Sequence, residues 1–461
     1  MRHIAAIAIV TMLLCLEQTL LAQDLPAPPP PQPSSAANAD TFSNSLAERI
    51  WISLQANIIV QQHPSFDAAY SGASSLRRAH ERATSYVETL YTGARLTRQL
   101  ELLFDLESTG GSTFSGGRGL GGVTNVDAPI DPTPGGARPY VSRAMLHYTI
   151  ALTTETTLAT RNPLALSSTV PTRRLELRIG KMSPIDFFDL NGACNDGHSQ
   201  FTNIAIVNNG AFDYAADLRG YTYGAVAEYY DASWALRFGE MLIPYGADSA
   251  HPGWSPARGH SENLEFEYHT NALLHRESVM RALAFMNDSP TARYSDALAA
   301  WRAGEDDVPD TGAHRMPGVR KVGFGLNAEH ALSDDWRAFW RLGWNDGESE
   351  PNPIDHSAAA GIDVHGTRWH RADDEIGAAI VVNGLSRVHR QYLESGGQSS
   401  GLGDGLLTYG PERIIETYYN AALRRGLSFT VSYQLVTHPA FNRDRGPVSV
   451  LGFRVHVERG R

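Results

Sequence analysis

Hydrophobic and polar residues alternate strictly in two segments near the C-terminus of this chain. From Leu427 to Leu435 every odd-numbered residue is apolar and every even-numbered residue is polar. The same pattern returns from Leu451 to Glu458, after a loop rich in charged and turn-forming residues. A period of two predicts a pair of strands, each with one apolar and one polar face. A soluble sandwich would show this pattern, and so would a membrane barrel with lipid outside and water inside.

Similar alternating runs recur along most of the chain. They add up to about fifteen strands, and an even total near sixteen is typical of a single-chain bacterial barrel. Short turns such as 231–233 join some strands, whereas long loops join others, and helical patches are expected within these loops at 292–303 and 386–394. The predicted strands include Ile52–Gln61, Ala83–Leu96, Leu100–Glu107, Tyr140–Leu152, Arg174–Ile179, Asp217–Tyr230, Trp234–Ile243, Leu264–Leu273, Glu277–Phe285, Val322–Glu329, Trp336–Asn345, Ile376–Val382 and Glu412–Leu423.

The N-terminus has the composition of an export signal. Charged residues at positions 2 and 3 precede an apolar run from Ile4 to Leu16, and Leu20-Leu21-Ala22 offers a small-residue cleavage site. The apolar run is shorter than the roughly 20 residues that a spanning helix needs, so a cleaved signal is favoured over an uncleaved anchor. We therefore expect a signal peptide at 1–22, a proline-rich linker at 23–45 and a barrel domain at 46–461.

Composition favours the barrel over the sandwich. Cleavage after Ala22 would leave Cys194 as the single cysteine, so no intrachain disulfide could form. Only 42% of the residues are hydrophobic and the mean hydropathy is -0.27, as expected for strands that are half polar around a wet lumen. The net charge of -11 argues against a nucleic-acid partner, because neutralising phosphates requires clustered cations. The chain is thus predicted to be all-β, a transmembrane antiparallel barrel of about sixteen strands with long loops on one side.

Motifs for catalysis or cofactor binding are weak in this sequence. Residues Gly117–Gly122 have the spacing GxGxxG, but no helical pattern follows them, as a dinucleotide site would require. The pairs His365/His370 and His251/His260 lack the spacing of a metalloprotease site. A Ser/His/Asp arrangement would have to be recognised by geometry. We expect no catalytic residues, no metal and no cofactor.

The polar faces of the predicted strands hold the candidate functional residues. A charge on a lipid-facing strand position costs about 2–4 kcal/mol at the bilayer midplane, so the charged positions must point into the lumen. Side chains of both signs suit hydroxyl-rich solutes, whereas a ring of one sign would select ions. The alternative is that these charges only neutralise one another. The strand-borne candidates are Arg174, Glu176, Arg178, Arg337, Arg341, Glu416 and Asn420.

Several segments, in order along the chain, are similar to one known family. They are His63–Leu76, Tyr91–Arg95, Arg178–Met182 with Asp186–Asp189, Gln200–Asn203, Asn209–Gly224 and Asn442–Val448. These segments resemble the carbohydrate-selective porins of the OprB type, and the resemblance covers roughly 51–458.

The resemblance implies a sixteen-stranded outer-membrane barrel that passes sugars by diffusion through a constriction of charged and polar residues. We expect 108–138 and 183–216 to be the loops that fold inward. Tyrosines of the central block could stack on sugar rings. That block adds the candidates Asn203, Asp213, Asp217, Arg219, Tyr221 and Tyr223.

Our main hypothesis is a passive porin of the bacterial outer membrane that is selective for carbohydrates. Its partners would be small sugars and outer-membrane lipid, and a homo-oligomer is left open. An outer-membrane barrel hydrolase is one alternative, and a structural or adhesive barrel without transport is the other.

Overall fold

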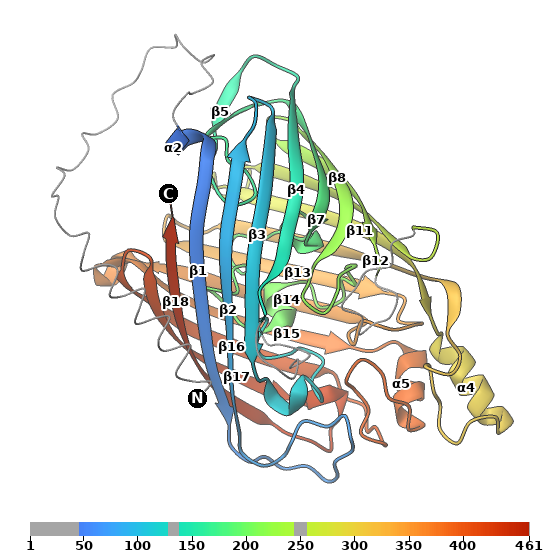
Figure 1. Ribbon diagram of the computed structural model, residues 1–461. Coiled ribbons are helices and arrows are strands. Elements are labelled where there is room, and N and C mark those ends of the chain that lie inside the picture. The colour runs from blue at the N-terminus through green and yellow to red at the C-terminus, as the bar shows by residue number, and fades with distance from the viewer. Residues whose placement is uncertain (1–45, 128–137, 244–255, 461) are drawn as a thin grey trace. The chain divides into compact units, whose positions relative to one another are not determined.

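Sixteen antiparallel strands form a closed barrel in the computed structural model (Figure 1). The structure describes residues 46–127, 138–243 and 256–460, which belong to the unit Ser43–Arg461. Each strand pairs with its neighbour along the barrel, and β18 pairs with β1 to close the sheet, from Ser53 opposite Gly460 to Gln62 opposite Leu451. The predicted all-β barrel is confirmed, whereas the expected signal peptide and linker lie outside the described residues.

The barrel strands follow one another in sequence order around the wall, except that β4 pairs directly with β7. Their bounds are β1 (Ile50–His63), β2 (Glu81–Arg95), β3 (Leu100–Gly111), β4 (Tyr140–Ala151), β7 (Arg174–Met182), β8 (Thr222–Tyr230), β9 (Trp234–Leu242), β10 (His260–Thr270), β11 (Ser278–Thr291), β12 (Met316–Ala331), β13 (Trp336–Asn345), β14 (His356–Gly366), β15 (Arg371–Gly384), β16 (Glu412–Arg424), β17 (Leu427–Thr437) and β18 (Val448–Gly460).

Short helices occur only outside the strands among the described residues. The expected helical patches are confirmed as α4 (Tyr294–Ala303) and α5 (Arg387–Glu394), and the side chain of Ser386 caps α5 by accepting from the His389 N–H. In the described parts of the chain, no helix is long and apolar enough to cross a bilayer. The other short helices are α2 (Leu46–Arg49), α3 (Ile204–Val207), η1 (Phe114–Gly116), η2 (Pro184–Asp186), η3 (Thr367–Trp369) and η4 (Pro439–Phe441).

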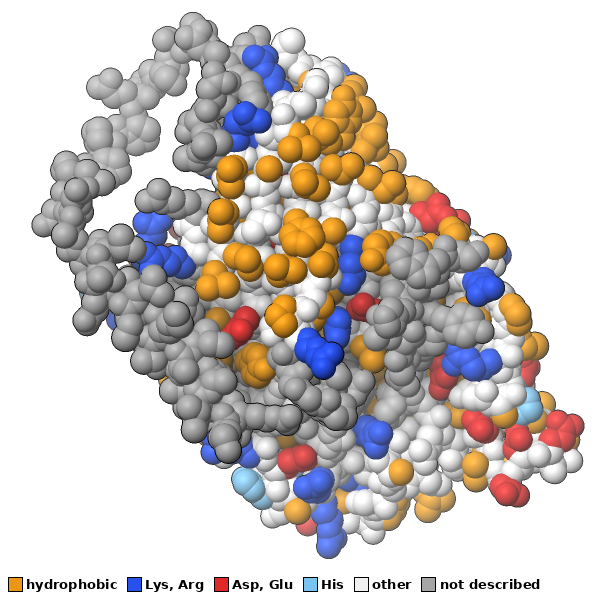
Figure 2. Space-filling model, in the orientation of Figure 1, with side chains coloured by type: hydrophobic (Ala, Val, Ile, Leu, Met, Phe, Trp, Pro, Cys, Tyr) orange, Lys and Arg blue, Asp and Glu red, His pale blue; other side chains and the backbone are white. Residues whose placement is uncertain are grey.

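The alternation in sequence becomes the two faces of the wall. On β17 and β18 the polar side chains of Thr430, Gln434 and Arg454 are buried, whereas Val431 and Phe453 remain exposed. Exposed apolar residues recur on the same side of nearly every strand, and Figure 2 shows many of them gathered on the outer surface. An outward apolar and an inward polar face are what a barrel in lipid requires.

The two ends of the barrel differ in their connections. At one end β8 and β9 are joined by residues 231–233 and β16 and β17 by 425–426, and both chain ends of the barrel lie there. At the other end connections such as 183–221 and 385–411 are long. The expected short-turn and long-loop ends are therefore present. The link between β4 and β7 departs from this pattern, because it lies at the short-turn end yet carries a hairpin of β5 (Thr156–Leu158) and β6 (Thr169–Pro171).

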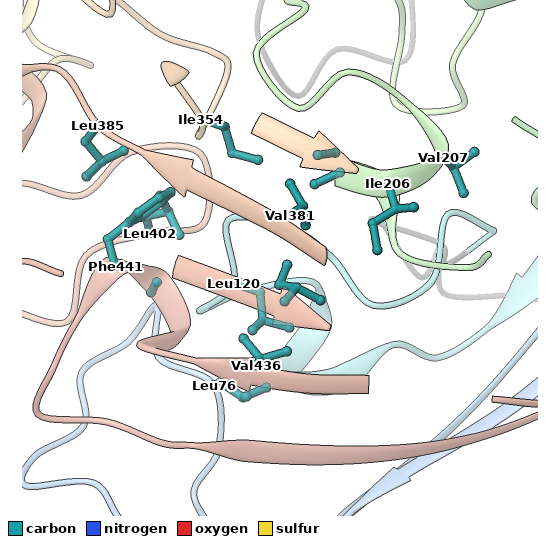
Figure 3. Close-up of a cluster of buried hydrophobic side chains, with 14 of the residues drawn as sticks. Leu76, Leu120, Ile206, Val207, Ile354, Val381, Leu385, Leu402, Val436 and Phe441 are labelled. Carbon is teal, nitrogen blue, oxygen red and sulfur yellow. The ribbon is translucent and has the colours of Figure 1, made fainter. Parts of the chain in front are cut away.

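The barrel interior also contains apolar clusters, although we expected a wet lumen. Residues Phe201, Ile206 and Val207 from the β7–β8 connection belong to one apolar cluster with wall residues that include Val381 and Ile414. Figure 3 shows Ile206, Val207 and Val381 in this cluster. A second cluster joins Phe188 and Phe212 of the same connection to inward residues of β3, β4, β8, β9 and β11. The long connections are thus held inside the barrel by apolar packing as well as by polar contacts.

Candidate functional site

A band of charges of both signs follows the inner wall of the barrel from β3 to β14. Inward charges meet opposite charges either two residues along the same strand or on the next strand, because inward residues lie side by side in both directions. Arg178 donates to Glu176 and to Glu228, both at 2.7 Å, and Arg174 lies 2.5 Å from Glu176. We call this band the charge belt: Glu101, His147, Arg174, Glu176, Arg178, Glu228, Arg237, Glu265, Glu267, Arg281, Glu329, Arg337 and Asp363.

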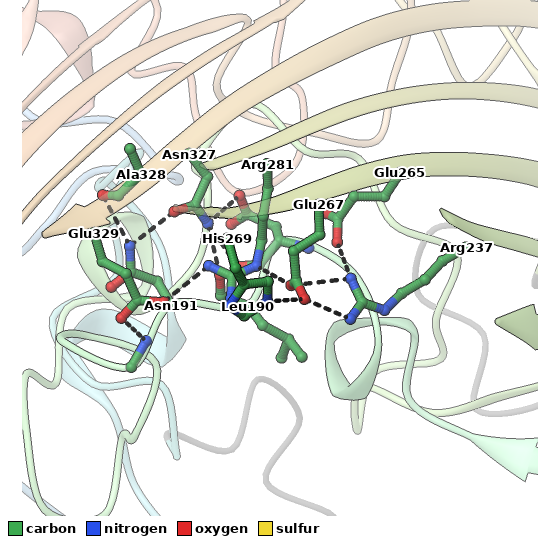
Figure 4. Close-up of polar contacts among 12 residues, drawn as sticks. Leu190, Asn191, Arg237, Glu265, Glu267, His269, Arg281, Asn327, Ala328 and Glu329 are labelled. Carbon is green, nitrogen blue, oxygen red and sulfur yellow. Dashed lines mark hydrogen bonds and ion pairs between the residues drawn. The ribbon is translucent and has the colours of Figure 1, made fainter. Parts of the chain in front are cut away.

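Arg237 is the most connected cation of the charge belt. Its guanidinium lies 3.3 Å from Glu228 and 3.1 Å from each of Glu265 and Glu267. Arg281 then continues the belt from Glu267 at 2.6 Å to Glu329 at 3.0 Å (Figure 4). Charges therefore neutralise one another between neighbouring strands, which was one of the two expected roles.

The connection of residues 183–221 between β7 and β8 folds into the lumen, and we call it the inner loop. Glu416 of β16 accepts from the Thr202 N–H at 2.8 Å, the Thr202 hydroxyl at 2.9 Å and the Asn203 N–H at 3.0 Å. Arg341 of β13 donates to the carbonyls of Ile206 and Val207 at 2.8 and 2.9 Å. Two candidates that we expected to line the pore, Arg341 and Glu416, are therefore buried anchors of the inner loop.

Further contacts hold the inner loop on other sides. Asn203 caps α3 through the Ala205 N–H and also donates to Gln434 at 3.1 Å. Asp213 forms an ion pair of 3.1 Å with the buried Lys321 of β12. The inner loop thus spans from β12 to β17 while its aromatic residues pack against other strands of the wall. This arrangement places it across the lumen, as expected for residues 183–216.

The described part of the β3–β4 connection also lies inside the barrel. The N–H groups of Gly121 and Gly122 donate to Glu412 at 3.0 and 2.6 Å, and Thr124 bonds to Gln61 at 2.8 Å. The N–H groups of the glycine-rich segment therefore bind a carboxylate of the wall. They anchor this segment inside the barrel and are not free to bind a phosphate. The expectation that this connection folds inward is met for residues up to 127.

A mixed aromatic and charged patch lies where β3, β4 and β7 meet the end of the inner loop. Tyr221 donates to Glu107 at 2.9 Å, and Arg143 binds Asp186 at 2.6 Å while lying 5.4 Å from the Tyr221 ring. Arg219 is exposed and lies 4.0 Å above the ring of Tyr140. Asp217 accepts from the N–H groups of Arg219 and Tyr221, which fixes the turn that presents them. We call this group the aromatic–arginine patch.

The remaining candidates, Asn420 and Tyr223, belong to neither the charge belt nor the inner loop. Asn420 is buried and accepts from the Thr430 hydroxyl at 2.8 Å, which ties β16 to β17. Tyr223 shares its side of β8 with the exposed Ala225, opposite the buried Val226 and Glu228. Alternation therefore places Tyr223 on the outward face of the wall, away from the lumen.

Much of the charge belt was missed in the sequence. Glu265 and Glu267 alternate with Leu264, Phe266 and Tyr268 on β10, so their inward orientation could have been read from the same pattern. Arg237, Arg281 and Asp363 occupy equivalent polar positions on their strands. The alternation that predicts these strands therefore also predicts their inward charges.

His198 of the inner loop is a pH-sensitive contact. Burial disfavours its charged form, but the carboxylates of Asp127 and Asp196 outweigh burial and raise the pKa of His198 to about 9. Its Nε2 lies 3.4 Å from Asp127, which in turn accepts from Asn57 of β1 at 2.6 Å. The ion pair therefore connects the inner loop to β1 through residue 127.

We expect this contact to weaken at alkaline pH. A pKa raised above the unfolded value of about 6.5 stabilises the folded state fully below that pH, and this stabilisation is lost as the pH rises to about 9. The urea midpoint of the unsubstituted protein should therefore fall over this range more than that of His198→Gln. Equal slopes in the two proteins would show that His198 does not carry this linkage.

A serine, a histidine and an aspartate lie near one another at the long-loop end, but they do not form a hydrolase site. Residues Gly397–Gly401 have the spacing GxSxG, but Ser399 lies in a loop after α5 and bonds to the Tyr294 hydroxyl at 2.9 Å. His389 is fully buried, bonds to Asp355 at 3.0 Å and stacks on the Tyr294 ring. This group packs α4 against α5. Within the described residues, no cluster of three or more His, Cys, Asp or Glu side chains is placed to hold a metal.

Comparisons with known proteins agree with this architecture. A family model described as carbohydrate-selective porin, OprB family, matches residues 163–458. Comparison with curated protein sequences gives no match. The high-pH structure of Pseudomonas putida OprB superposes with a TM-score of 0.68 at 12% identity, over 90% of this chain and 95% of that one. Its low-pH structure gives 0.48 at 11% identity, covering 90% and 94%, and a mutant of the Rh. blastica porin gives 0.45 at 7%, covering 89% and 100%.

Proposed function

This chain belongs to the carbohydrate-selective porin family OprB and is a porin of the bacterial outer membrane, and on that premise we propose that it passes small sugars by passive diffusion. The observation that carries the proposal is the aromatic–arginine patch beside the inner loop. The exposed guanidinium of Arg219 offers donors to sugar hydroxyls, and the half-buried Tyr140 beside it offers apolar ring surface.

The lining that we propose differs from the sequence candidates in part. In the aromatic–arginine patch we keep the exposed Arg219 as a contact for sugars, while the buried Asp217 and Tyr221 support it. In the charge belt we keep Arg174 and Arg337, whereas Glu176 and Arg178 are buried and paired with each other. Asn203, Asp213, Arg341 and Glu416 shape the pathway by holding the inner loop. Asn420 stiffens the wall, and Tyr223 is left out because it faces outward.

Charge balance supports a neutral solute. The charge belt contains both signs and its members pair with one another, so it offers no ring of one sign to an ion. Binding by such groups would be weak, as passage through a pore requires. Transport of this kind needs no cofactor and no covalent step, so we propose a channel without enzymatic activity.

The surroundings of the barrel follow from the same proposal. Short turns face the periplasm and long loops face the exterior in barrels of this class. The exposed apolar side chains of the outer face would contact outer-membrane lipid. We propose that residues 1–22 are removed on export and that each barrel holds its own pathway, so a homo-oligomer would multiply the conductance without creating it.

Reconstitution tests this function directly. We expect channel openings in planar bilayers, and liposomes containing the protein should swell in monosaccharide solutions faster than in solutions of longer oligosaccharides. Absence of channels and of swelling would overturn the porin function for this chain. Swelling that is the same for all solutes of equal size would overturn sugar selectivity alone. Hydrolysis of lipid or peptide substrates by the purified protein would overturn the non-enzymatic assignment.

A further inference from the structure

The connection between β4 and β7 is unusual for the short-turn end of the barrel. Its stem continues the pairing of these strands, since the Thr172 N–H donates to the Glu155 carbonyl and the Ala159 N–H to the Ser168 carbonyl, both at 2.9 Å. Between them β5 and β6 form a two-stranded sheet outside the barrel wall. Leu158 on this stem is 87% exposed, and Figure 1 shows β5 at the end of the barrel near α2.

The tip of this hairpin, residues 159–168, lies against the inner face of the barrel. Leu166 is fully buried and belongs to the apolar cluster that contains Leu103 and Met145. Its N–H donates to Glu101 at 3.0 Å, and Arg178 donates to the Leu164 carbonyl at 2.7 Å. Glu101 and Arg178 are inward members of the charge belt, so the tip lies in the lumen.

The tip has a fixed conformation. Asn162 accepts from the N–H groups of Leu164 and Ala165 at 2.8 and 3.1 Å, which closes a turn. Arg161 donates to the Leu166 carbonyl at 2.8 Å, and its guanidinium lies 5.6 Å from the ring of Trp51 on β1. Local bonds therefore hold the turn, and contacts to the wall hold the turn in place.

We propose that this tip is a second constriction, at the periplasmic side of the barrel and in series with the inner loop. The proposal rests on the proposed function, because it concerns the same pathway. The tip takes up space beside β1, β2, β3 and β7, and it occupies a guanidinium N–H of Arg178 and a carboxylate oxygen of Glu101. The tip thus limits the size of the solute that leaves the barrel. It also keeps Arg178 and Glu101 from contacting that solute.

A matched pair of cysteine variants tests the position of the tip. Ala165→Cys places a thiol on the tip, and Leu158→Cys places one on the exposed stem of the same hairpin. Burial raises the pKa of the native Cys194 thiol to about 12 and so keeps it unreactive. Attachment of a bulky thiol reagent, verified by mass, should lower the single-channel conductance of Ala165→Cys and leave that of Leu158→Cys unchanged. Equal conductance of labelled and unlabelled Ala165→Cys would overturn the proposal.

Excision of the hairpin gives an independent test. Residues 153–172 can be replaced by Asn-Gly, a sequence suited to a two-residue turn between antiparallel strands. We expect the conductance to rise on the order of twofold, and larger oligosaccharides should enter liposomes, because one of two resistances in series is removed. Unchanged conductance and size limit would overturn the second constriction. If the unsubstituted protein forms no channels at all, the proposed function itself is overturned.

Discussion

Replacing Glu416 with alanine is expected to raise the single-channel conductance and to widen the size limit for solutes. The Glu416 carboxylate accepts from the backbone of Thr202 and Asn203 and from the Thr202 hydroxyl, and it is fully buried. Without it, donors of the inner loop remain unsatisfied, at a cost of about 1–3 kcal/mol each. The inner loop should then leave the wall at this point. Planar-bilayer conductance and swelling with an oligosaccharide series measure both effects.

Two further variants show whether the effect of Glu416→Ala comes from the lost hydrogen bonds to the inner loop or from the lost charge. Glu240→Ala removes a carboxylate from an exposed position of β9 and should leave conductance unchanged. Glu416→Gln keeps one acceptor oxygen but adds an NH2 group facing the inner-loop donors, so its conductance should lie between those of Glu416→Ala and the unsubstituted protein. If Glu416→Ala conducts like Glu240→Ala, Glu416 does not hold the constriction.

Replacing Arg237 with alanine is expected to give the largest loss of stability. The guanidinium of Arg237 pairs with Glu228, Glu265 and Glu267, and all four side chains are buried. Removing one partner of a buried ion pair costs about 3–5 kcal/mol, because the remaining charges stay buried without compensation. The unfolding midpoint in urea should fall accordingly. The reversal potential should also shift toward cation selectivity, because the lumen gains negative charge.

The matched control is an arginine in an exposed ion pair. Arg320 lies 2.8 Å from Asp288, and more than half of its side chain is exposed. Water and salt screen such a pair, so Arg320→Ala should leave the unfolding midpoint close to that of the unsubstituted protein. A midpoint for Arg237→Ala that equals that of Arg320→Ala would contradict a structural role for the charge belt.

Strands with a clear alternation were predictable, and one strand without it was not. On β17 and β18 the apolar side chains all fall on one face, so the sequence determines which face meets lipid. Strand β14 was missed because Ala358, Ala359, Ala360 and Gly361 follow one another without any change of polarity. Its place between β13 and β15 comes from pairing with both neighbours.

The roles of the inward charges could not be read from the chain. Arg341 and Glu416 were expected to line the pore, yet their partners lie in the inner loop, more than a hundred residues away in sequence. The hairpin of β5 and β6 looks like an ordinary connection until Leu166 is seen to bind Glu101. Contacts of this kind exist only once the barrel has closed and the connections have packed inside it.

The sequence by itself determined the wall of this protein: the barrel class, most of its strands, the lipid-facing residues and the family. Alternation is a local property with a period of two, so neighbouring residues are sufficient to set it. Only the tertiary structure decided what the lumen contains, namely the paired charge belt, the inner loop and the tip at the short-turn end. Those features depend on which inward side chains meet across strands and loops, and these contacts form only when the sheet closes and the connections pack inside it.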